Sequence, residues 1–232
     1  MTLDVIIPVY NEQDTLAEVL ERVLASPLEP TIVAVDDGSS DGSPGILGRY
    51  AGNDRVCVAS HERNLGKGAA VRTGIGMATG DIILVQDADL EYDPEDYGAI
   101  VALFNDPAVE VVYGSRRLDR TNPTGSPMFL LGGVSLTWIT NVLYGTRITD
   151  EPTCYKAFRR ELLQSLPLSC MRFEFCPEVT AIVARRGIAI HEVPISYAPR
   201  SKAEGKKIGV GDWFEAVHTL LKYRFAPRRT IE

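Results

Sequence analysis

Apolar runs and amphipathic stretches alternate along the first 85 residues of this 232-residue chain. The predicted strands are residues 3–8, 31–35, 56–59 and 82–85, and the predicted helices are residues 11–24, 44–50 and 67–78. Strands that alternate with helices over this length form a parallel sheet with right-handed crossovers. The sequence therefore predicts an α/β fold: one Rossmann-like domain over residues 1–232, with a mostly parallel central sheet flanked by helices.

Three carboxylates follow the last of these strands at alternate positions, at Asp87, Asp89 and Glu91. Side chains at alternate positions of an extended segment share a face, so the three are expected to converge and to repel one another unless a cation lies between them. Oxygen ligands of this kind suit Mg²⁺ or Mn²⁺. The alternative is a solvated acidic turn before a helix that starts at Pro94.

Two more polar clusters follow predicted strands, at Tyr10-Asn11-Glu12 and at Asp36-Asp37. Ligands of a parallel sheet lie at the carboxyl ends of its strands, where all three clusters are expected. Tyr10 offers a flat face, and Glu12 and Asp37 can accept hydrogen bonds from a ribose or a base. These features predict a nucleotide site, although each cluster could also cap a helix or turn the chain.

Glycine-containing segments elsewhere do not support other nucleotide folds. Residues 64–68, Asn-Leu-Gly-Lys-Gly, lack the Ser or Thr that a phosphate loop needs after its lysine, and Gly74-Ile75-Gly76 lies inside a predicted helix. We expect Gly66 and Gly68 to permit a close backbone approach at a helix start, with Lys67 near the nucleotide.

Charge and cysteine content limit the partners and the compartment. The net charge of −7 argues against nucleic acid, but residues 185–232 carry 10 Lys/Arg against 5 Asp/Glu, which favours an anionic ligand or membrane surface near this end, or a solvated helix face. The four cysteines show no metal-binding or disulfide spacing, and no signal peptide is recognisable. A cytoplasmic protein, peripheral on the cytoplasmic face of a membrane, is expected.

Five short motifs follow one another in order along the chain. They are Ile7-Pro8-Val9-Tyr10-Asn11-Glu12, Val35-Asp36-Asp37-Gly38-Ser39-Ser40-Asp41-Gly42, Asn64-Leu65-Gly66-Lys67-Gly68, Asp87-Ala88-Asp89 and Gly114-Ser115-Arg116. Together they resemble family 2 glycosyltransferases of the GT-A fold, and within that family the dolichyl- or polyprenyl-phosphate sugar synthases of the dolichol-phosphate mannose synthase type. The resemblance covers nearly the whole chain.

This resemblance implies a role for particular side chains. It implies that Pro8, Tyr10, Glu12 and Asp37 bind the nucleoside of a sugar donor, GDP-mannose or UDP-glucose, and that Asp87, Asp89 and Glu91 surround the metal and the diphosphate. Donor or acceptor phosphates would meet Arg116 and Arg200, with Lys202, Lys206 or Lys207; surface salt bridges are the alternative for these cations.

The implied acceptor is a polyprenyl phosphate, and its chemistry simplifies the reaction. A phosphomonoester has a second pKa near ~6, so it is mostly dianionic at neutral pH and needs positioning more than deprotonation. The resemblance implies that the anomeric carbon is inverted. A hydroxyl acceptor would instead need a base, for which Asp150 is the candidate; a helix cap is the alternative reading of Asp150.

Residues 121–146 carry no charged side chain, which is a long interval for this chain. Glycines and polar residues within it make a membrane span unfavourable. We expect a helix near residues 126–145 that either lies in a membrane interface, with Trp138 and Tyr144 at the headgroups, or packs against the sheet. The basic and aromatic end of the chain would add attraction to anionic lipid.

The expected organisation is a nucleotide-sugar half (1–115), an acceptor half (116–200) and a basic tail (201–232). Synthases of this type often carry an arginine where this chain has Leu131-Gly132-Gly133 and a glycine where it has Cys154. These departures concern the acceptor site. A processive polysaccharide synthase is not expected, because no Q-x-x-R-W pattern and no C-terminal transmembrane pair is present.

Other classes remain open at this point. A soluble family 2 transferase that acts on a glycan or small-molecule hydroxyl is the main alternative. A nucleotidyltransferase would share the sheet and the metal, but the chain lacks its N-terminal glycine-rich phosphate loop. A nucleotide-binding protein without catalysis is a further alternative, which the three retained carboxylates disfavour.

Overall fold

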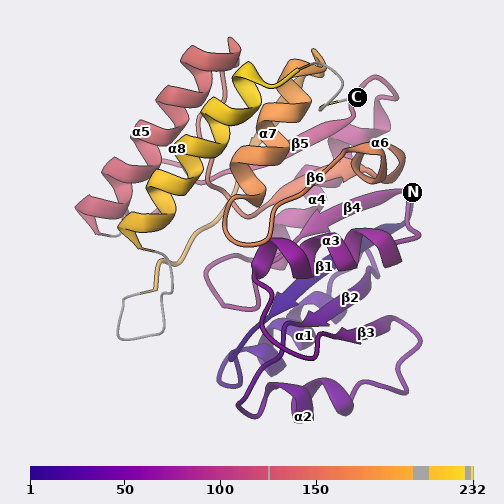
Figure 1. The fold of residues 1–232 in the computed structure, drawn as a ribbon. Helices are drawn as coiled ribbons and strands as arrows, with labels where there is room; N and C mark the ends of the chain where they lie inside the picture. Colours follow the sequence, from indigo (N-terminus) through magenta and orange to yellow (C-terminus); the bar gives the residue numbers. More distant parts are fainter. Residues whose placement is uncertain (125, 201–208, 228–230, 232) are drawn as a thin grey trace.

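The computed structural model describes residues 1–124, 126–200, 209–227 and 231. One seven-stranded sheet organises the chain, in the order β3-β2-β1-β4-β6-β5-β7 (Figure 1). The strands are β1 (Leu3–Val9), β2 (Thr31–Asp36), β3 (Val56–Ser60), β4 (Ile82–Val85), β5 (Val111–Ser115), β6 (Lys156–Arg159) and β7 (Ile190–Pro194). Only β6 is antiparallel to its neighbours, so the predicted mostly parallel α/β sheet is confirmed.

The central strands are the most deeply buried part of the core. Val5, Ile6 and Ile7 of β1 are fully buried, as are the first three residues of β4. Helices pack against both faces of the sheet (Figure 1). Because β1, β2 and β4 are mutually parallel, their carboxyl ends lie together at one edge of the sheet. That edge is the one expected to carry the polar clusters.

The helices predicted from the sequence are present, the first of them with a later start, and the structure adds others that were not predicted. In chain order they are α1 (Leu16–Leu24), α2 (Ser43–Gly48), α3 (Lys67–Met77), α4 (Tyr97–Ala102), α5 (Pro127–Tyr144), α6 (Arg160–Ser165), α7 (Phe175–Arg185) and α8 (Val210–Phe225), with 3₁₀ turns at Pro94–Asp96 and Leu103–Asn105. In Figure 1, α3 lies in front of the sheet, against β1 and β2, whereas α5, α7 and α8 form a separate helical layer.

The first helix starts at Leu16, not at residue 11 as predicted. Asn11 has a left-handed backbone (φ 50°), which is incompatible with an α-helix, and its side chain accepts a hydrogen bond from Ser40 N at 2.8 Å. The backbone N–H of Glu12 donates to Ser43 Oγ at 3.0 Å. The polar segment after β1 is therefore bound to the loop after β2 instead of joining the helix.

The uncharged segment forms a helix where one was expected. α5 begins with Pro127 in its first turn, and it ends where Gly145 adopts a left-handed conformation (φ 70°) and donates from its N–H to Asn141 O. α5 is the one helix in the described part of the chain that is long and apolar enough to cross a membrane, and 17% of its length is buried in the protein.

The segment expected to be a basic tail contains α8, which packs against α5 and α7 (Figure 1). Arg185 of α7 holds the end of α8, because its guanidinium donates to Tyr223 O at 2.6 Å and to Ala226 O at 2.8 Å. Buried Tyr223 also donates its hydroxyl to Glu178. Residues 210–225 thus belong to the folded helical layer.

Candidate active site

A large cleft of about 1790 Å³ begins at the carboxyl edge of the sheet and continues beneath α5 and α8. Its polar end is lined by residues that the sequence singled out, namely Pro8, Tyr10, Glu12, Asp37, Lys67, Asp87, Asp89, Glu91, Arg116, Asp150 and Arg200. Its other end is lined by apolar residues of the helical layer, among them Met128, Leu131 and Trp213. Lys206 lies outside the described residues, as do Lys202 and Lys207.

Arg200 lies across the polar end of the cleft and joins two strand ends. Its guanidinium contacts Asp89 Oδ2 at 2.5 Å and Glu12 Oε2 at 3.1 Å. Glu12 follows β1 and Asp89 follows β4, so one cation neutralises carboxylates from two strands. The structure thus brings together three of the predicted site residues.

A second ion pair lies beside the first. Lys67, at the start of α3, pairs with Asp87. Burial opposes ionisation of the Asp87 carboxyl, but the Lys67 ammonium outweighs it and lowers the pKa of Asp87. Asp87 is therefore held as an anion at the cleft wall, as a ligand for a cation would need to be.

Glu91 does not join Asp87 and Asp89 as expected. Its carboxylate accepts from Tyr197 Oη at 3.0 Å and from Arg200 N at 2.8 Å, and its backbone carbonyl accepts from Ala198 N. Across residues 1–124, 126–200, 209–227 and 231, no group of three or more His, Cys, Asp or Glu side chains is arranged to hold a metal ion. Glu91 instead anchors the segment that carries Arg200.

The electrostatics of Asp89 nevertheless fit a divalent cation. Burial, followed by repulsion from Asp87 and Glu91, raises the pKa of Asp89 to about 7. A hard cation with oxygen ligands would relieve this repulsion, and the carboxylates of Asp87 and Asp89 are suitable donors for Mg²⁺ or Mn²⁺. The guanidinium of Arg200 supplies positive charge beside Asp89 in this structure.

Among the residues predicted to bind the donor, Asp37 has the side chain most fully engaged in hydrogen bonds within the protein. Its carboxylate accepts from Leu65 N at 2.9 Å and Gly66 N at 2.7 Å, and it contacts His61 Nδ1 at 2.7 Å. With 2% of its surface exposed, Asp37 shapes the loop before α3. The expected direct hydrogen bond to a nucleoside would use the acceptor site that remains on Asp37 Oδ2.

The glycines before and within α3 have the role that the sequence suggested. Gly66 has φ 103°, and a Cβ on it would lie 2.3 Å from Met171 O. Gly68 donates from its N–H to Arg172 O at 2.8 Å, and a Cβ there would lie 2.8 Å from the same oxygen. The predicted close backbone approach is confirmed, and the partner is the segment at residues 170–172.

Asp150 is tied to Arg116 by a bidentate ion pair. Asp150 Oδ2 accepts from Arg116 Nε at 2.7 Å, and Oδ1 accepts from Nη2 at 2.7 Å. Burial opposes ionisation of Asp150, but the Arg116 charge outweighs it and lowers the pKa of the carboxyl. Asp150 lies in a turn between α5 and β6, so the helix-cap interpretation is wrong. The side chain is arranged to orient Arg116, not to accept a proton.

Sequence reasoning missed several residues that shape the cleft. The hydroxyl oxygen of Tyr92 accepts a hydrogen bond from Cys154 N at 3.1 Å, and the centre of its ring lies 5.5 Å from that of Tyr197. Arg117 follows Arg116 and also lines the cleft. Their only sequence signal was position: Arg117 directly follows a motif that ends a strand.

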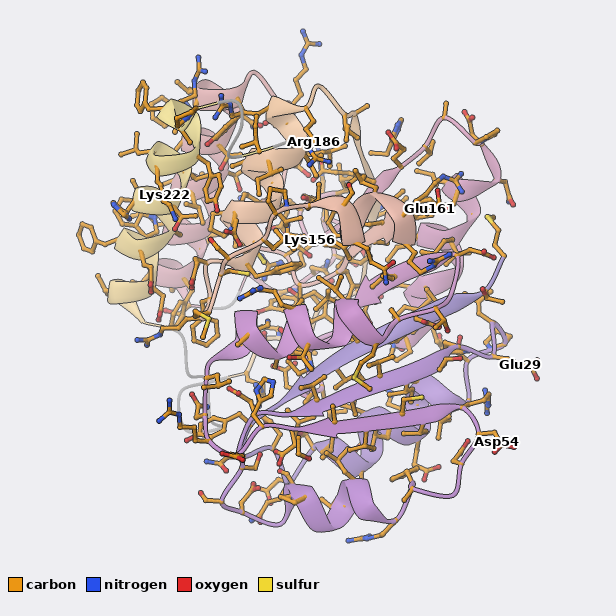
Figure 2. The ribbon with its side chains drawn as sticks, turned by 45° about the vertical axis from the view of Figure 1, so that its right-hand side comes forward. Glu29, Asp54, Lys156, Glu161, Arg186 and Lys222 are labelled. Atoms are coloured by element: carbon orange, nitrogen blue, oxygen red, sulfur yellow. The ribbon has the colours of Figure 1, made fainter. Side chains whose placement is uncertain are left out.

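Glu151 is a further missed residue, and it is fully buried beside Asp150. Neither of its carboxylate oxygens has a hydrogen-bond partner among the described residues, and burial raises the pKa of Glu151 to about 7. The nearby Lys156 lies in the interior (Figure 2), where its ammonium donates to the backbone carbonyl of Glu151 and lies 3.7 Å from the centre of the Tyr113 ring. Sequence alone gave no signal for this burial.

The helical layer exposes apolar side chains next to the cleft mouth. On α5, Leu131 is 70% and Trp138 is 65% exposed, and on α8 Phe214 is 63% exposed. Tyr144, expected at a membrane interface with Trp138, instead donates its hydroxyl to Leu220 O of α8. α5 therefore packs on α8 through one face and exposes its other face. Its packing is mainly on α8 and α7 and not, as one of the two alternatives had it, on the sheet, and the interfacial arrangement stays a prediction.

A mostly parallel α/β sheet with carboxylates at its carboxyl edge defines the class of protein, and comparison with known sequences gives the family. The chain belongs to glycosyl transferase family 2, whose sequence profile matches residues 4–166. It is 32% identical over 213 residues to the undecaprenyl-phosphate 4-deoxy-4-formamido-L-arabinose transferase of Edwardsiella ictaluri, an alignment that covers 88% of this chain and 62% of that relative. The chain thus spans less than two thirds of the relative's length.

Solved structures with low sequence identity share the fold. Glucosyl-3-phosphoglycerate synthase from Mycobacterium tuberculosis, crystallised with Mn²⁺, uridine-diphosphate and phosphoglyceric acid, superposes with a TM-score of 0.75 at 21% identity, over 97% of this chain and 79% of that one. Mannosyl-3-phosphoglycerate synthase from Rubrobacter xylanophilus gives 0.72 at 20% identity, over 96% and 72% of the two chains. The expected GT-A fold is therefore confirmed.

Proposed function

We propose that this protein is a metal-dependent, inverting glycosyltransferase that moves a hexose, with mannose as the first candidate, from a nucleotide-diphosphate sugar to a polyprenyl phosphate. The observation that carries the proposal is the continuity of one cleft from the paired carboxylates to the exposed apolar helices. A sugar diphosphate is a polar anion that needs cations, whereas a polyprenyl chain needs apolar surface. Both requirements are met along the same cleft.

The donor would lie at the polar end. Pro8 and Tyr10 line the wall at the carboxyl end of β1, where Tyr10 is 37% exposed and can pack against a base. Glu12 can accept hydrogen bonds from ribose hydroxyls, and Asp37 acts through the loop that it holds. Asp87 and Asp89 would hold Mg²⁺ or Mn²⁺, which, when bound, offsets the charge of the leaving diphosphate.

Arg200 would change partners when donor and metal bind. Its guanidinium now neutralises Asp89 and Glu12, and a metal on Asp89 would compete with it for the same carboxylate. A displaced guanidinium remains tethered beside Glu91 through its backbone and can pair with a phosphate oxygen. Lys67 stays with Asp87 at the wall of the cleft.

Catalysis would then consist of positioning two anions. The acceptor phosphate is already ionised at neutral pH, so no residue needs to remove a proton from it. Arg116, whose orientation is fixed by Asp150, would bring the phosphate oxygen in line with the anomeric carbon. In-line attack breaks the bond to the diphosphate and inverts the anomeric centre.

Membrane association follows from the same surface. We propose that α5 and α8 rest on a lipid headgroup layer through Leu131, Trp138 and Phe214, so that the protein acts as a peripheral membrane enzyme. Lys222 and Arg224, in the last turn of α8, add positive charge to this side of the molecule. An anionic vesicle is the appropriate binding partner for a test.

A soluble transferase is the second candidate, and one observation favours it. The structural neighbours crystallised with phosphoglyceric acid share the fold and bind a small acceptor-like anion without a lipid tail. In that case the cleft would take a hydroxyl of a small molecule or glycan. The exposed apolar helices would then have no part in acceptor binding.

The test is transfer of labelled sugar from GDP-mannose and from UDP-glucose, each with and without a short-chain polyprenyl phosphate, in Mg²⁺ or Mn²⁺ and with a chelator control. We expect product only when the lipid phosphate and the metal are both present, with one donor strongly preferred. Transfer to 3-phosphoglycerate or a free sugar, with none to the lipid, would replace this proposal with the soluble alternative.

A further inference from the structure

Arg117 occupies the place where the polar and apolar ends of the cleft meet. It extends from the end of β5, and its guanidinium Nη2 donates to Leu130 O, in the first turn of α5, at 3.4 Å. Its side chain is 28% exposed and lines the cleft. Arg117 is thus a cation at the entrance to the apolar helices.

The charge of Arg117 is poorly neutralised by its neighbours. Asp150 lies 4.0 Å from Arg117 Nε, but both oxygens of that carboxylate are already engaged at 2.7 Å by Arg116. One carboxylate therefore faces two guanidinium groups. The nearby Asp119 accepts from Thr121 N and Oγ1 through one oxygen, Oδ1.

The room for this side chain comes from a glycine of α5. A Cβ on Gly133 would lie 3.5 Å from Arg117 Nη2 and 3.4 Å from Pro152 Cγ, so the guanidinium reaches the surface of α5 where that helix has no side chain. A branched residue at this position would crowd Arg117. The positive end of the α5 dipole lies at the same end of the helix and also favours an anion.

We propose that Arg117 is a specificity-determining residue that binds the phosphate monoester of the acceptor. This inference rests on the proposed function and deepens it by naming the side chain that selects an acceptor with a phosphate. Arg116 and Arg117 together form a two-guanidinium site with a single carboxylate, so the three groups carry a net positive charge that attracts an anionic phosphate. The planar donors of Arg117 suit two phosphate oxygens at once.

The test compares Arg117→Gln and Arg117→Lys with the wild-type protein. Arg117→Gln is expected to raise the acceptor KM about ten- to a hundredfold, with the donor KM and kcat changed less than about threefold, because a charge-assisted hydrogen bond to the acceptor is lost. Arg117→Lys should give an intermediate acceptor KM, since the charge remains and the planar fork does not. Arg49→Gln removes the same charge from the exposed end of α2 and should match the wild type.

Parallel assays with a short-chain polyprenyl phosphate and with 3-phosphoglycerate distinguish a lipid source of the phosphate from a soluble one. An acceptor KM for Arg117→Gln within about threefold of the wild-type value would overturn the inference while leaving the proposed function intact. A lower kcat and melting temperature with both KM values unchanged would also overturn it, since that pattern reports a structural role. If the wild-type protein transfers sugar to no phosphate-bearing acceptor, the proposed function fails, and this inference fails with it.

Discussion

The two ends of the cleft are built in opposite ways. At the carboxyl edge of β1, β2 and β4, the charged groups Asp87, Asp89 and Asp37 are buried or nearly so, and each has a partner in the protein. Along α5 and α8, large apolar side chains such as Leu131 and Trp138 are exposed. The first end is organised by ion pairs and hydrogen bonds within the protein, whereas the second has apolar surface that the described residues leave uncovered.

This difference indicates that the two ends contribute to binding free energy in different ways. At the sheet edge, a donor and a metal must replace ion pairs such as Arg200 with Asp89, so affinity depends on exchange of partners. At the helical layer, burial of exposed apolar surface contributes directly. Variants at the two ends should therefore affect different properties.

The largest effect is expected at Asp89. Asp89→Asn should lower transfer about a hundred- to thousandfold, because the carboxylate that would hold the metal is lost. Its melting temperature should not fall, since the substitution removes the repulsion that raises the pKa of Asp89. Asp54→Asn, at the outer edge of the molecule (Figure 2), is the matched control and should retain full activity. Unchanged turnover of Asp89→Asn would refute the metal assignment.

Glu151 lies between the two ends and should make folding stability depend on pH. Its pKa of about 7 in the folded protein exceeds the ordinary value of 4.5 for glutamate, so between these two pH values the folded state holds a proton that the unfolded state has lost. The associated stabilisation is fully present below pH 4.5 and is lost as the pH rises through 7, and it amounts to at most about 3 kcal/mol. Glu151→Gln should remove this dependence in urea unfolding between pH 5 and pH 8. If the free energies of unfolding of the wild type and of Glu151→Gln changed with pH in the same way, Glu151 would not be the source of the pH dependence.

Charges on the exposed face of α5 should separate membrane binding from chemistry. The double variant Leu131→Glu/Trp138→Glu is expected to weaken binding to anionic vesicles about thirtyfold or more, because two apolar side chains no longer enter the interface. Transfer to a short-chain acceptor in detergent should change much less. Met77→Glu, at the end of α3, serves as the control with an exposed apolar residue elsewhere. Equal vesicle binding by all three proteins would mean that α5 does not contact lipid.

The smallest effects are expected at two glycines of the rigid end. Gly66→Ala should destabilise the fold by about 2 kcal/mol, since φ is 103° and Met171 O lies 2.3 Å from the new Cβ. Gly76→Ala meets no atom within 4 Å in helix α3 and should stabilise the fold by up to about 1 kcal/mol. Urea unfolding of both variants tests this contrast. Equal free energies of unfolding would show that the segment at residues 170–172 can move to make room for a Cβ at residue 66.

The same contrast explains what could be predicted from the sequence. Strand periodicity and the order of polar motifs located the sheet and its carboxyl edge, because backbone geometry forces parallel strands to end together. The partners of Glu91 and Asp37 could not be predicted, since Tyr197, Arg200 and Leu65 reach them only through the tertiary fold. The start of α1 was misplaced for the same reason.

The helical layer was harder to predict than the sheet edge. An uncharged segment with no strong apolar periodicity predicts a helix but not which of its faces is covered. The packing of α8 on α5 determines which face of α5 is covered. Tyr144 lies on the covered face, where it hydrogen-bonds to Leu220 O of α8, and Trp138 lies on the exposed face. Arg117 and Glu151 were missed because their roles depend on tertiary contacts. The Glu151 carboxylate has no hydrogen-bond partner among the described residues, and Asp150, the carboxylate near Arg117, is already paired with Arg116. No local sequence pattern predicts either situation.

The most direct test of the central claim is the initial rate of sugar transfer to a short-chain polyprenyl phosphate and to the corresponding polyprenol, at saturating donor and Mg²⁺. We predict that only the phosphate is glycosylated, since the cleft provides guanidinium groups for an anion, and the candidate base Asp150 has a lowered pKa and both of its oxygens are engaged by Arg116. A comparable rate with the polyprenol would contradict it, because the acceptor would then be recognised by its chain alone.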